Sequence, residues 1–161
     1  ICSDVTLIQS NCFDKCAKLA TVTFPSLVTI ESNAFSSIIA LEEINFPEVR
    51  TVGSSAFQGC TDLKTVVLES CQVVNAYAFD QCISLSRIEI PELKSISYCG
   101  FRDTACQELS FLKLDTLYTG TVDKVSNVGA QFMNCKQLHT FSAPICPVIT
   151  SNIGESESNL S

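Results

Sequence analysis

The feature that most constrains this sequence is a phenylalanine that returns every 22 residues. Phe13, Phe35, Phe57, Phe79 and Phe101 mark the same point in successive segments of the chain. A period of this size is typical of solenoids, in which each repeat buries its apolar face only against its neighbours. The sequence therefore predicts a stack of similar units in place of a globular fold around one central core.

The other apolar residues follow the same period. When Leu41 is numbered as position 1, apolar residues recur at positions 1, 4, 6, 9, 12, 16, 17 and 20. Leu19, Leu63 and Leu85 begin three further repeats with this spacing. Positions 4 to 6 alternate apolar, variable and apolar residues, which predicts one short strand per repeat. Proline often follows at position 7 and should end the strand, because it has no backbone N–H to donate.

The predicted fold is an α/β solenoid that coils in the right-handed sense. One short parallel strand per repeat of about 22 residues lies on one side, and turns or short helices lie on the other. The repeat domain is placed at residues 1–153, with about seven repeats of which the first and last are incomplete, and a polar tail follows at 154–161.

The fifth full repeat departs from the period, because Phe101 and Phe132 are 31 residues apart. We assign two extra residues to 102–106 and the rest to an insertion at 118–127. On this alignment Leu109, Leu112 and Leu114 face the core. Phe111 then falls at position 3, which is exposed in the other repeats.

Charge and composition exclude some classes of function. The net charge is −7, which argues against nucleic-acid binding because contact with phosphates needs a basic face. No apolar run reaches the roughly 18 residues of a membrane span. The chain begins with Ile1 and shows no signal peptide, so we expect an excised domain or a processed product. The first repeat lacks its leading strand residues, so either further repeats precede it or residues 2–8 pair with another chain.

Ten cysteines would suggest a disulfide framework, but the repeat phase favours another interpretation. Most of them occupy apolar positions and are predicted to be small buried hydrophobic residues: Cys2, Cys16, Cys60, Cys71, Cys82, Cys106, Cys135 and Cys146. Cys12 and Cys99 are less clearly part of the core, and the one disulfide we predict joins Cys99 to Cys106. The sequence leaves the redox state of the other thiols open.

Nothing in the sequence indicates an enzyme. The single histidine, His139, has no second histidine for a metal site and is expected to be an exposed strand residue. No Gly-x-Ser-x-Gly elbow and no glycine-rich phosphate loop occurs, and no cysteine pair has the spacing of a zinc site. We therefore expect no catalytic residue, no cofactor and no metal.

Two stretches carry a resemblance to a known family. The sequence AFQGCTDLKTVVL at residues 56–68, with INFPEVRTVGSSAF at 44–57, resembles the leucine-rich repeat of the BspA-like type. The resemblance implies a surface recognition module, in some members an adhesin for host matrix proteins, and hence a cell-surface or secreted protein. A cytoplasmic location is the alternative. Position 9 lacks the asparagine that other leucine-rich repeats place there.

In a parallel-strand solenoid the residues between the apolar positions point outward, and we expect a protein partner to bind on this concave face. The predicted partner-binding residues of the strands and turns are Glu43, Asn45, Thr65, Val67, Arg87, Glu89, Phe111, Lys113 and His139. The insertion adds Tyr118, Asp123 and Lys124, because insertions in repeat proteins often form binding loops. Two alternatives remain: a structural spacer that assembles through its N-terminal repeat, and an intracellular scaffold with reduced thiols.

Overall fold

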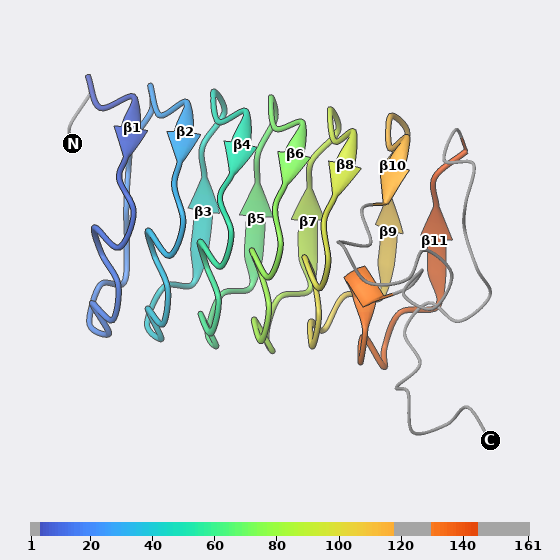
Figure 1. Ribbon diagram of the computed structural model, residues 1–161. Helices are drawn as coiled ribbons and strands as arrows, with labels where there is room; N and C mark the ends of the chain where they lie inside the picture. Colours follow the sequence, from blue (N-terminus) through green and yellow to red (C-terminus); the bar gives the residue numbers. More distant parts are fainter. Residues whose placement is uncertain (1–3, 118–129, 145–161) are drawn as a thin grey trace.

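The computed structural model describes residues 4–117 and 130–144, which form a solenoid of stacked coils held by short parallel strands (Figure 1). One side of the coils carries a six-stranded sheet made of β1 (Leu7–Ile8), β2 (Thr29–Ile30), β4 (Thr51–Val52), β6 (Val73–Val74), β8 (Ser95–Ile96) and β10 (Thr116–Leu117). A three-stranded sheet contains β3 (Glu43–Asn45), β5 (Thr65–Val67) and β7 (Arg87–Glu89), and a two-stranded sheet contains β9 (Glu108–Ser110) and β11 (Thr140–Ser142).

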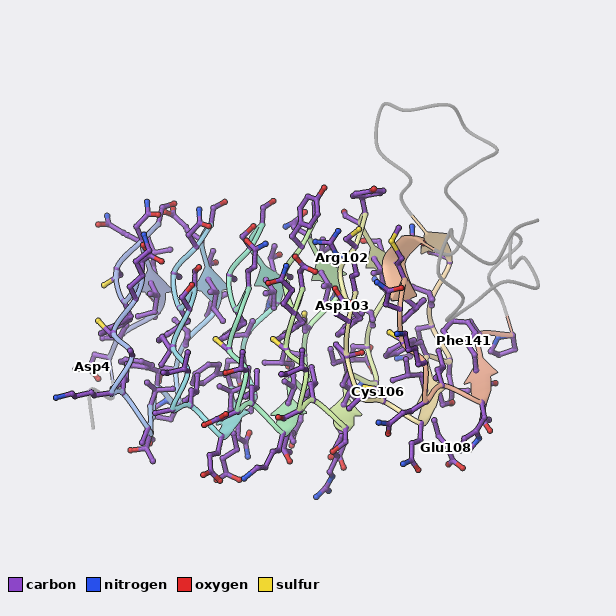
Figure 2. All side chains as sticks on the ribbon, turned by 90° about the horizontal axis from the view of Figure 1, so that it is seen from below. Asp4, Arg102, Asp103, Cys106, Glu108 and Phe141 are labelled. Carbon is purple, nitrogen blue, oxygen red and sulfur yellow. The ribbon has the colours of Figure 1, made fainter. Side chains whose placement is uncertain are left out.

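The strand register confirms the 22-residue repeat. Glu43 pairs with Thr65 and Thr65 with Arg87, while Thr29 pairs with Thr51 in the six-stranded sheet. Equivalent side chains therefore form parallel rows along the stack (Figure 2). Stacking of this kind lets every coil bury its apolar residues against the next one.

The prediction of one strand per repeat is wrong, because the regular coils carry two. The first strand lies at positions 3 to 5, close to the predicted site, and the second lies at positions 11 and 12. The second strand is only two residues long, as in β4 and β6. Two residues are too few to show an alternating pattern, so hydrophobic periodicity could not reveal this strand.

The turns expected between the strands are present, but the alternative of short helices is not: the described residues contain no α-helix and only one 3₁₀ turn, η1 (Ala130–Phe132), so they form a β-solenoid and not an α/β one. Between the strands, backbone N–H groups donate to the next coil; the Phe35 N–H, for example, donates to the Ala56 carbonyl at 2.8 Å. Residues at positions 15 and 19 adopt the left-handed conformation, as Ser55 (φ 55°) and Gly59 (φ 72°) do. Left-handed residues cannot continue an α-helix, so these segments form turns.

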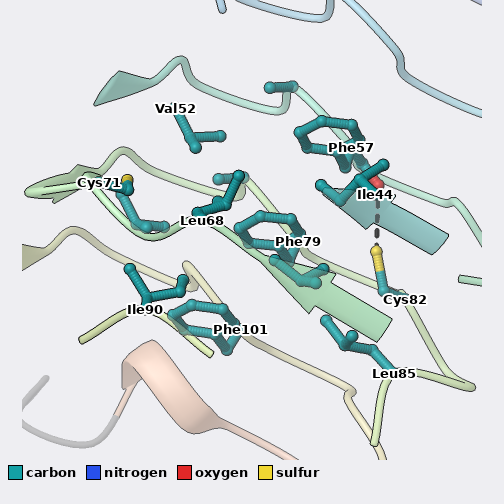
Figure 3. Packing of buried hydrophobic residues seen from close by; sticks show 14 of the residues in the cluster. Ile44, Val52, Phe57, Leu68, Cys71, Phe79, Cys82, Leu85, Ile90 and Phe101 are labelled. Carbon is teal, nitrogen blue, oxygen red and sulfur yellow. Dashed lines mark hydrogen bonds between the residues drawn. The ribbon is translucent and has the colours of Figure 1, made fainter. Parts of the chain in front are cut away.

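The periodic phenylalanines form a continuous stack through the core (Figure 3). Phe57 lies fully buried between Phe35 and Phe79, with ring centroids 5.1 and 5.3 Å away and rings within 4° of parallel. The column continues to Phe101 at 5.2 Å and then to Phe132 at 5.9 Å. The prediction that these side chains share one buried column is confirmed.

The alignment of the fifth full repeat is corrected by the strand register. Leu117 pairs with Ile96, which is an offset of 21 residues. The segment between these two strands is therefore one residue shorter than the 22-residue period, whereas the sequence alignment had assigned it two extra residues. Phe111 therefore stands at position 6, where it is 1% exposed and packs 6.2 Å from the Phe101 ring. Leu112, which was assigned to the core, is 62% exposed.

Buried thiols form a second column beside the phenylalanines. Cys60, Cys82 and Cys135 each donate a hydrogen bond of 3.1 Å to the carbonyl of a phenylalanine in the preceding coil, as Figure 3 shows for Cys82 and Phe57. This confirms the prediction that they are buried core residues. Each thiol thus satisfies a carbonyl that would otherwise face the apolar interior.

The predicted disulfide does not form. All eight described cysteines are free, including Cys99 and Cys106, and the Cys106 thiol donates instead to the Leu85 carbonyl at 3.2 Å. Cys16 is exposed, contrary to the prediction, because it lies in the first described coil; Cys12 is exposed as well. Cys2 and Cys146 lie outside the described residues.

Because its core contains buried thiols, we expect the protein to lose stability at alkaline pH. Burial raises the pKa of Cys60, Cys71 and Cys106 to about 12, whereas a thiol in an unfolded chain has a pKa of about 8.5. Their contribution to the free energy of unfolding is therefore complete below about pH 8.5. It is lost as the pH rises toward 12, by about 1.4 kcal/mol per pH unit for each thiol. Urea unfolding between these pH values measures the slope. We expect Cys60→Ala to reduce the slope by about 1.4 kcal/mol per pH unit, while Ile83→Ala, at an exposed apolar residue, keeps it; an unchanged slope in Cys60→Ala would contradict the prediction.

Candidate functional site

The outer face of the three-stranded sheet collects six of the predicted binding residues. The strands alternate as expected: in β3 and β7 the outer residues are exposed, and in β5 they are half-buried. Register places them in two rows across the sheet, which we call the outer rows: Glu43, Thr65 and Arg87 in one, and Asn45, Val67 and Glu89 in the other. Because paired strands lie about 4.8 Å apart, one partner could contact all six side chains.

The other predicted residues have different placements. Lys113 follows β9 in a turn, where its Nζ lies 2.6 Å from Glu92 Oε1. His139 is exposed just before β11, and its Nδ1 lies 3.1 Å from Thr140 Oγ1. Phe111 is buried, so the prediction that it is an exposed anchor for a partner is wrong. Tyr118, Asp123 and Lys124, together with the insertion at 118–127, lie outside the described residues.

Ion pairs neutralise only part of the acidic charge near the outer rows. Lys64 pairs with Glu42 at 2.9 Å, and Arg87 pairs with Glu89, between side chains that are largely exposed. Exposed pairs of this kind contribute about 0–1 kcal/mol each, so they are easily exchanged for contacts with a partner. Glu43, Glu48, Glu69 and Glu108 form no salt bridge with another described residue. The face therefore keeps a net negative character.

Two grooves, which the sequence did not predict, cross this side of the molecule. The first has a volume of about 390 Å³ and is lined by Thr21, Val22, Thr23, Pro25, Glu43, Asn45 and Pro47. The second, of about 530 Å³, is lined by Val67, Glu69, Ile88, Glu89, Ile90, Pro91 and Ser110. Each groove contains members of the outer rows, so grooves and rows form one continuous surface.

A buried ionic cluster is the other polar feature that the sequence did not predict. The Asp80 carboxylate is fully buried and accepts two hydrogen bonds from the Arg102 guanidinium, at 2.6 and 2.8 Å, and one from Gln58 Nε2 at 2.9 Å. The hydrogen bond to Asp80 raises the pKa of Arg102 further above its ordinary value. Arg102 also lies 5.5 Å from the centre of the Tyr77 ring, and Figure 2 marks its place in the stack. The sequence did contain a signal for this pair, because Asp80 and Arg102 occupy the same repeat position in successive coils.

No group of three or more His, Cys, Asp or Glu side chains within 4–117 and 130–144 could hold a metal ion. No helix in that part of the chain is long and apolar enough to cross a membrane.

Comparison with known structures identifies bacterial leucine-rich repeat proteins of the same fold. A leucine-rich repeat protein from Bacteroides ovatus aligns with a TM-score of 0.60 and 23% identity, over 78% of this chain and 32% of that one. The Treponema protein TpLRR (T. pallidum) gives 0.59 and 20%, over 76% and 66%. A leucine rich cell surface protein from Faecalibacterium prausnitzii gives 0.52 and 19%, over 81% and 42%. The chain thus spans less than two thirds of the length of each of these proteins.

Sequence comparison gives the family. No curated protein matches the chain. The model of the BspA type leucine rich repeat region matches in six copies, over residues 1–110 and 69–156. These repeats commonly mediate protein–protein interactions and generally form non-enzymatic scaffolds. The chain belongs to the BspA-type leucine-rich repeat family.

Proposed function

We propose that this protein is a surface-displayed, non-enzymatic recognition module that binds a protein partner through the outer rows. The observation that carries the proposal is the alignment of two rows of mostly polar, outward side chains on three neighbouring strands, exposed on β3 and β7 and half-buried on β5. Repeat proteins use such rows as extended binding surfaces, because the core residues hold the backbone while the outer residues are free to vary.

The charge of the surface indicates what kind of partner fits. Glu43 has no salt bridge with a described residue, and the chain as a whole carries a net charge of −7. A partner with a basic patch would be attracted to this face, and complementary charge mainly raises the rate of association. Val67, half-buried in the middle of the sheet, supplies an apolar contact between the charged residues.

Support for display at the cell surface comes from the comparisons. One of the similar solved structures is described as a leucine rich cell surface protein. The resemblance to BspA-like repeats also makes host matrix proteins the class of partner to test first.

Reversal of two charges in the outer rows tests the proposal. We expect at least one protein in a panel of purified host extracellular-matrix proteins to bind the immobilised chain in surface plasmon resonance. The double variant Glu43→Lys with Arg87→Glu keeps the net charge and should weaken this binding about tenfold, equivalent to about 1.4 kcal/mol. Both residues are exposed, so the fold should be retained.

The control is Arg50→Glu, a charge reversal at an exposed residue just before β4 in the six-stranded sheet. We expect this variant to bind within about twofold of the native chain, a difference of only a few tenths of a kcal/mol. Equal losses in the control and in the double variant would remove the assignment of binding to the outer rows. Absence of binding to every matrix protein would contradict the proposed class of partner.

A further inference from the structure

The sheet that carries the outer rows is interrupted between β7 and β9. β7 pairs with β5 only, and β9 pairs with β11 only, although β8 and β10 of the same two coils remain paired. Figure 1 shows a wider interval between β7 and β9 than between β5 and β7. The core stack widens at the same place, from 5.2 Å between Phe79 and Phe101 to 5.9 Å between Phe101 and Phe132. The interruption coincides with the coil that is one residue short.

The interruption leaves backbone groups of β7 without the partners that their equivalents have. At position 6, the N–H groups of Phe46, Leu68 and Phe111 donate to the neighbouring strand at 3.1, 2.9 and 2.8 Å. The equivalent N–H of Ile90 donates to no described backbone carbonyl. A strand edge with unpaired N–H and C=O groups is a template for pairing with another extended chain.

The second groove lies along this free edge. It is lined by Ile88, Glu89 and Ile90 from the β7 side and by Ser110 from β9. Ile88 is only half-buried, whereas Ile44 and Val66 at the same repeat position are 1% and 0% exposed. The groove thus has an apolar floor, and its volume of about 530 Å³ falls within the range of about 300–1,000 Å³ that is typical of ligand sites.

The rim of the groove is acidic. Glu69 and Glu89 line it, and Glu69 has no salt bridge with another described residue. Glu108, on the outer face of β9, has none either. Successive side chains of an extended peptide point to opposite sides. A peptide paired with β7 would therefore place one side chain on the apolar floor and the next beside the acidic rim.

We propose that the free edge of β7 binds an extended segment of a protein partner in which apolar residues alternate with lysine or arginine. This inference rests on the proposed function and specifies one mode of binding within it, the addition of a strand to an exposed sheet edge. The Ile90 N–H donates to the peptide, an apolar side chain of the peptide contacts Ile88 and Ile90, and a basic side chain pairs with Glu69 or Glu89. A whole strand between β7 and β9 needs roughly 9.6 Å, two strand spacings, so binding moves the two-stranded sheet outward.

A defined peptide tests this assignment. The probe is a fluorescein-labelled, end-capped heptapeptide with the sequence Val-Lys-Val-Lys-Val-Lys-Val, whose binding is followed by fluorescence anisotropy at low salt. We expect saturable binding, and we expect none for the peptide in which glutamate replaces lysine. Amide hydrogen exchange read by NMR should show the Ile90 N–H slowing at least about tenfold in the saturated complex, because the new hydrogen bond must open before exchange.

Two matched variants locate the site. Ser110→Phe fills the groove from β9, and we expect it to weaken binding of the peptide at least about tenfold. Ser142→Phe makes the same change at the same repeat position of β11, where the residue is exposed away from the break, and should leave binding within about twofold. Binding that Ser110→Phe does not weaken, or an Ile90 amide that is not protected, overturns the proposal, and so does failure of the peptide to bind.

The two proposals fail in different ways. In one outcome, the Glu43→Lys, Arg87→Glu variant loses matrix-protein binding and the native chain does not bind the peptide. This outcome supports the outer rows as the binding site and removes the strand-edge site. In the other outcome, Ser110→Phe weakens peptide binding, but the charge reversals leave matrix-protein binding unchanged. This outcome supports the strand-edge site and removes the outer rows.

Discussion

Replacement of Phe57 by alanine is expected to lower the free energy of unfolding by about 3–5 kcal/mol. Phe57 is fully buried and stacks on both sides, at 5.1 Å from Phe35 and 5.3 Å from Phe79. The substitution removes the apolar area, opens a cavity in the middle of the stack and deletes two aromatic pairs, each of which contributes about 0.5–1.5 kcal/mol beyond burial. Equilibrium urea unfolding followed by circular dichroism measures the loss.

The location of Phe57 adds a second expectation. Since each coil contacts only its neighbours, weakening one contact should reduce the cooperativity between the coils on either side. We therefore expect a shallower unfolding transition in Phe57→Ala than in the native chain. The control is Ile83→Ala, at a side chain that is 59% exposed, for which we expect a change within about 0.5 kcal/mol. Similar losses in the two variants would show that the phenylalanine column is not the principal core.

Replacement of Arg102 by alanine is the second change with a large expected effect, a loss of about 3–5 kcal/mol. The reason lies in the partner that remains. The Asp80 carboxylate has no exposed surface, and without Arg102 it keeps only the hydrogen bond from Gln58. A buried charge without a counter-ion is strongly destabilising, whereas the intact pair stabilises the fold much less than its short distances suggest. The measurement is the free energy of unfolding at neutral pH.

Three further variants separate the contributions to this cluster. Arg102→Lys keeps the charge but cannot donate the paired hydrogen bonds of a guanidinium, so an intermediate loss is expected. The double variant Asp80→Asn with Arg102→Met removes both charges and should be more stable than Arg102→Ala alone. Arg87→Ala is the control, because its pair with Glu89 is exposed and contributes about 0–1 kcal/mol. A loss in Arg102→Ala no greater than in Arg87→Ala would contradict the prediction.

The period of the sequence was sufficient to predict the stack, the buried phenylalanines and the outward side chains of the first strand. These features depend on residue type at fixed positions, and the regular coils keep that spacing from Leu41 to Ile96. The 22-residue offset between paired strands follows directly from it. The sequence was also correct about the burial of most of the described cysteines, because the apolar pattern places them in the core.

The misassigned residues lie where one repeat departs from the period. The sequence alignment placed this strand three positions out of register, because leucines alone were used to place it. It therefore assigned Phe111, which is buried, to the exposed face and Leu112, which is exposed, to the core. The aromatic ring would have been the better marker, since it packs against the phenylalanine column at position 6 as Phe46 does. Of the turns or short helices predicted between the strands, the described residues contain turns and no α-helix. These turns have left-handed backbone at two positions of each regular coil, and most of the residues there are not glycine, so the usual glycine signal for such turns is missing from the sequence.

The polar features of the site were not predicted for a different reason. The pairing of Asp80 with Arg102 depends on which turn residues meet across coils, and the second groove depends on the missing ladder between β7 and β9. Both arise from relations between repeats. Inspection of one repeat at a time does not reveal them.

The unequal attachment of successive coils has a mechanical consequence for the protein. The coils that contain β3, β5 and β7 are joined to one another by two ladders and by hydrogen bonds between their turns. At the interruption the neighbouring coils are joined by the short β8–β10 ladder and by turn contacts such as the bond from the Phe101 N–H to the Gln131 carbonyl at 2.8 Å. Tension along the long axis would therefore separate coils that share a single ladder, as at this joint, before it separates the coils from β3 to β7.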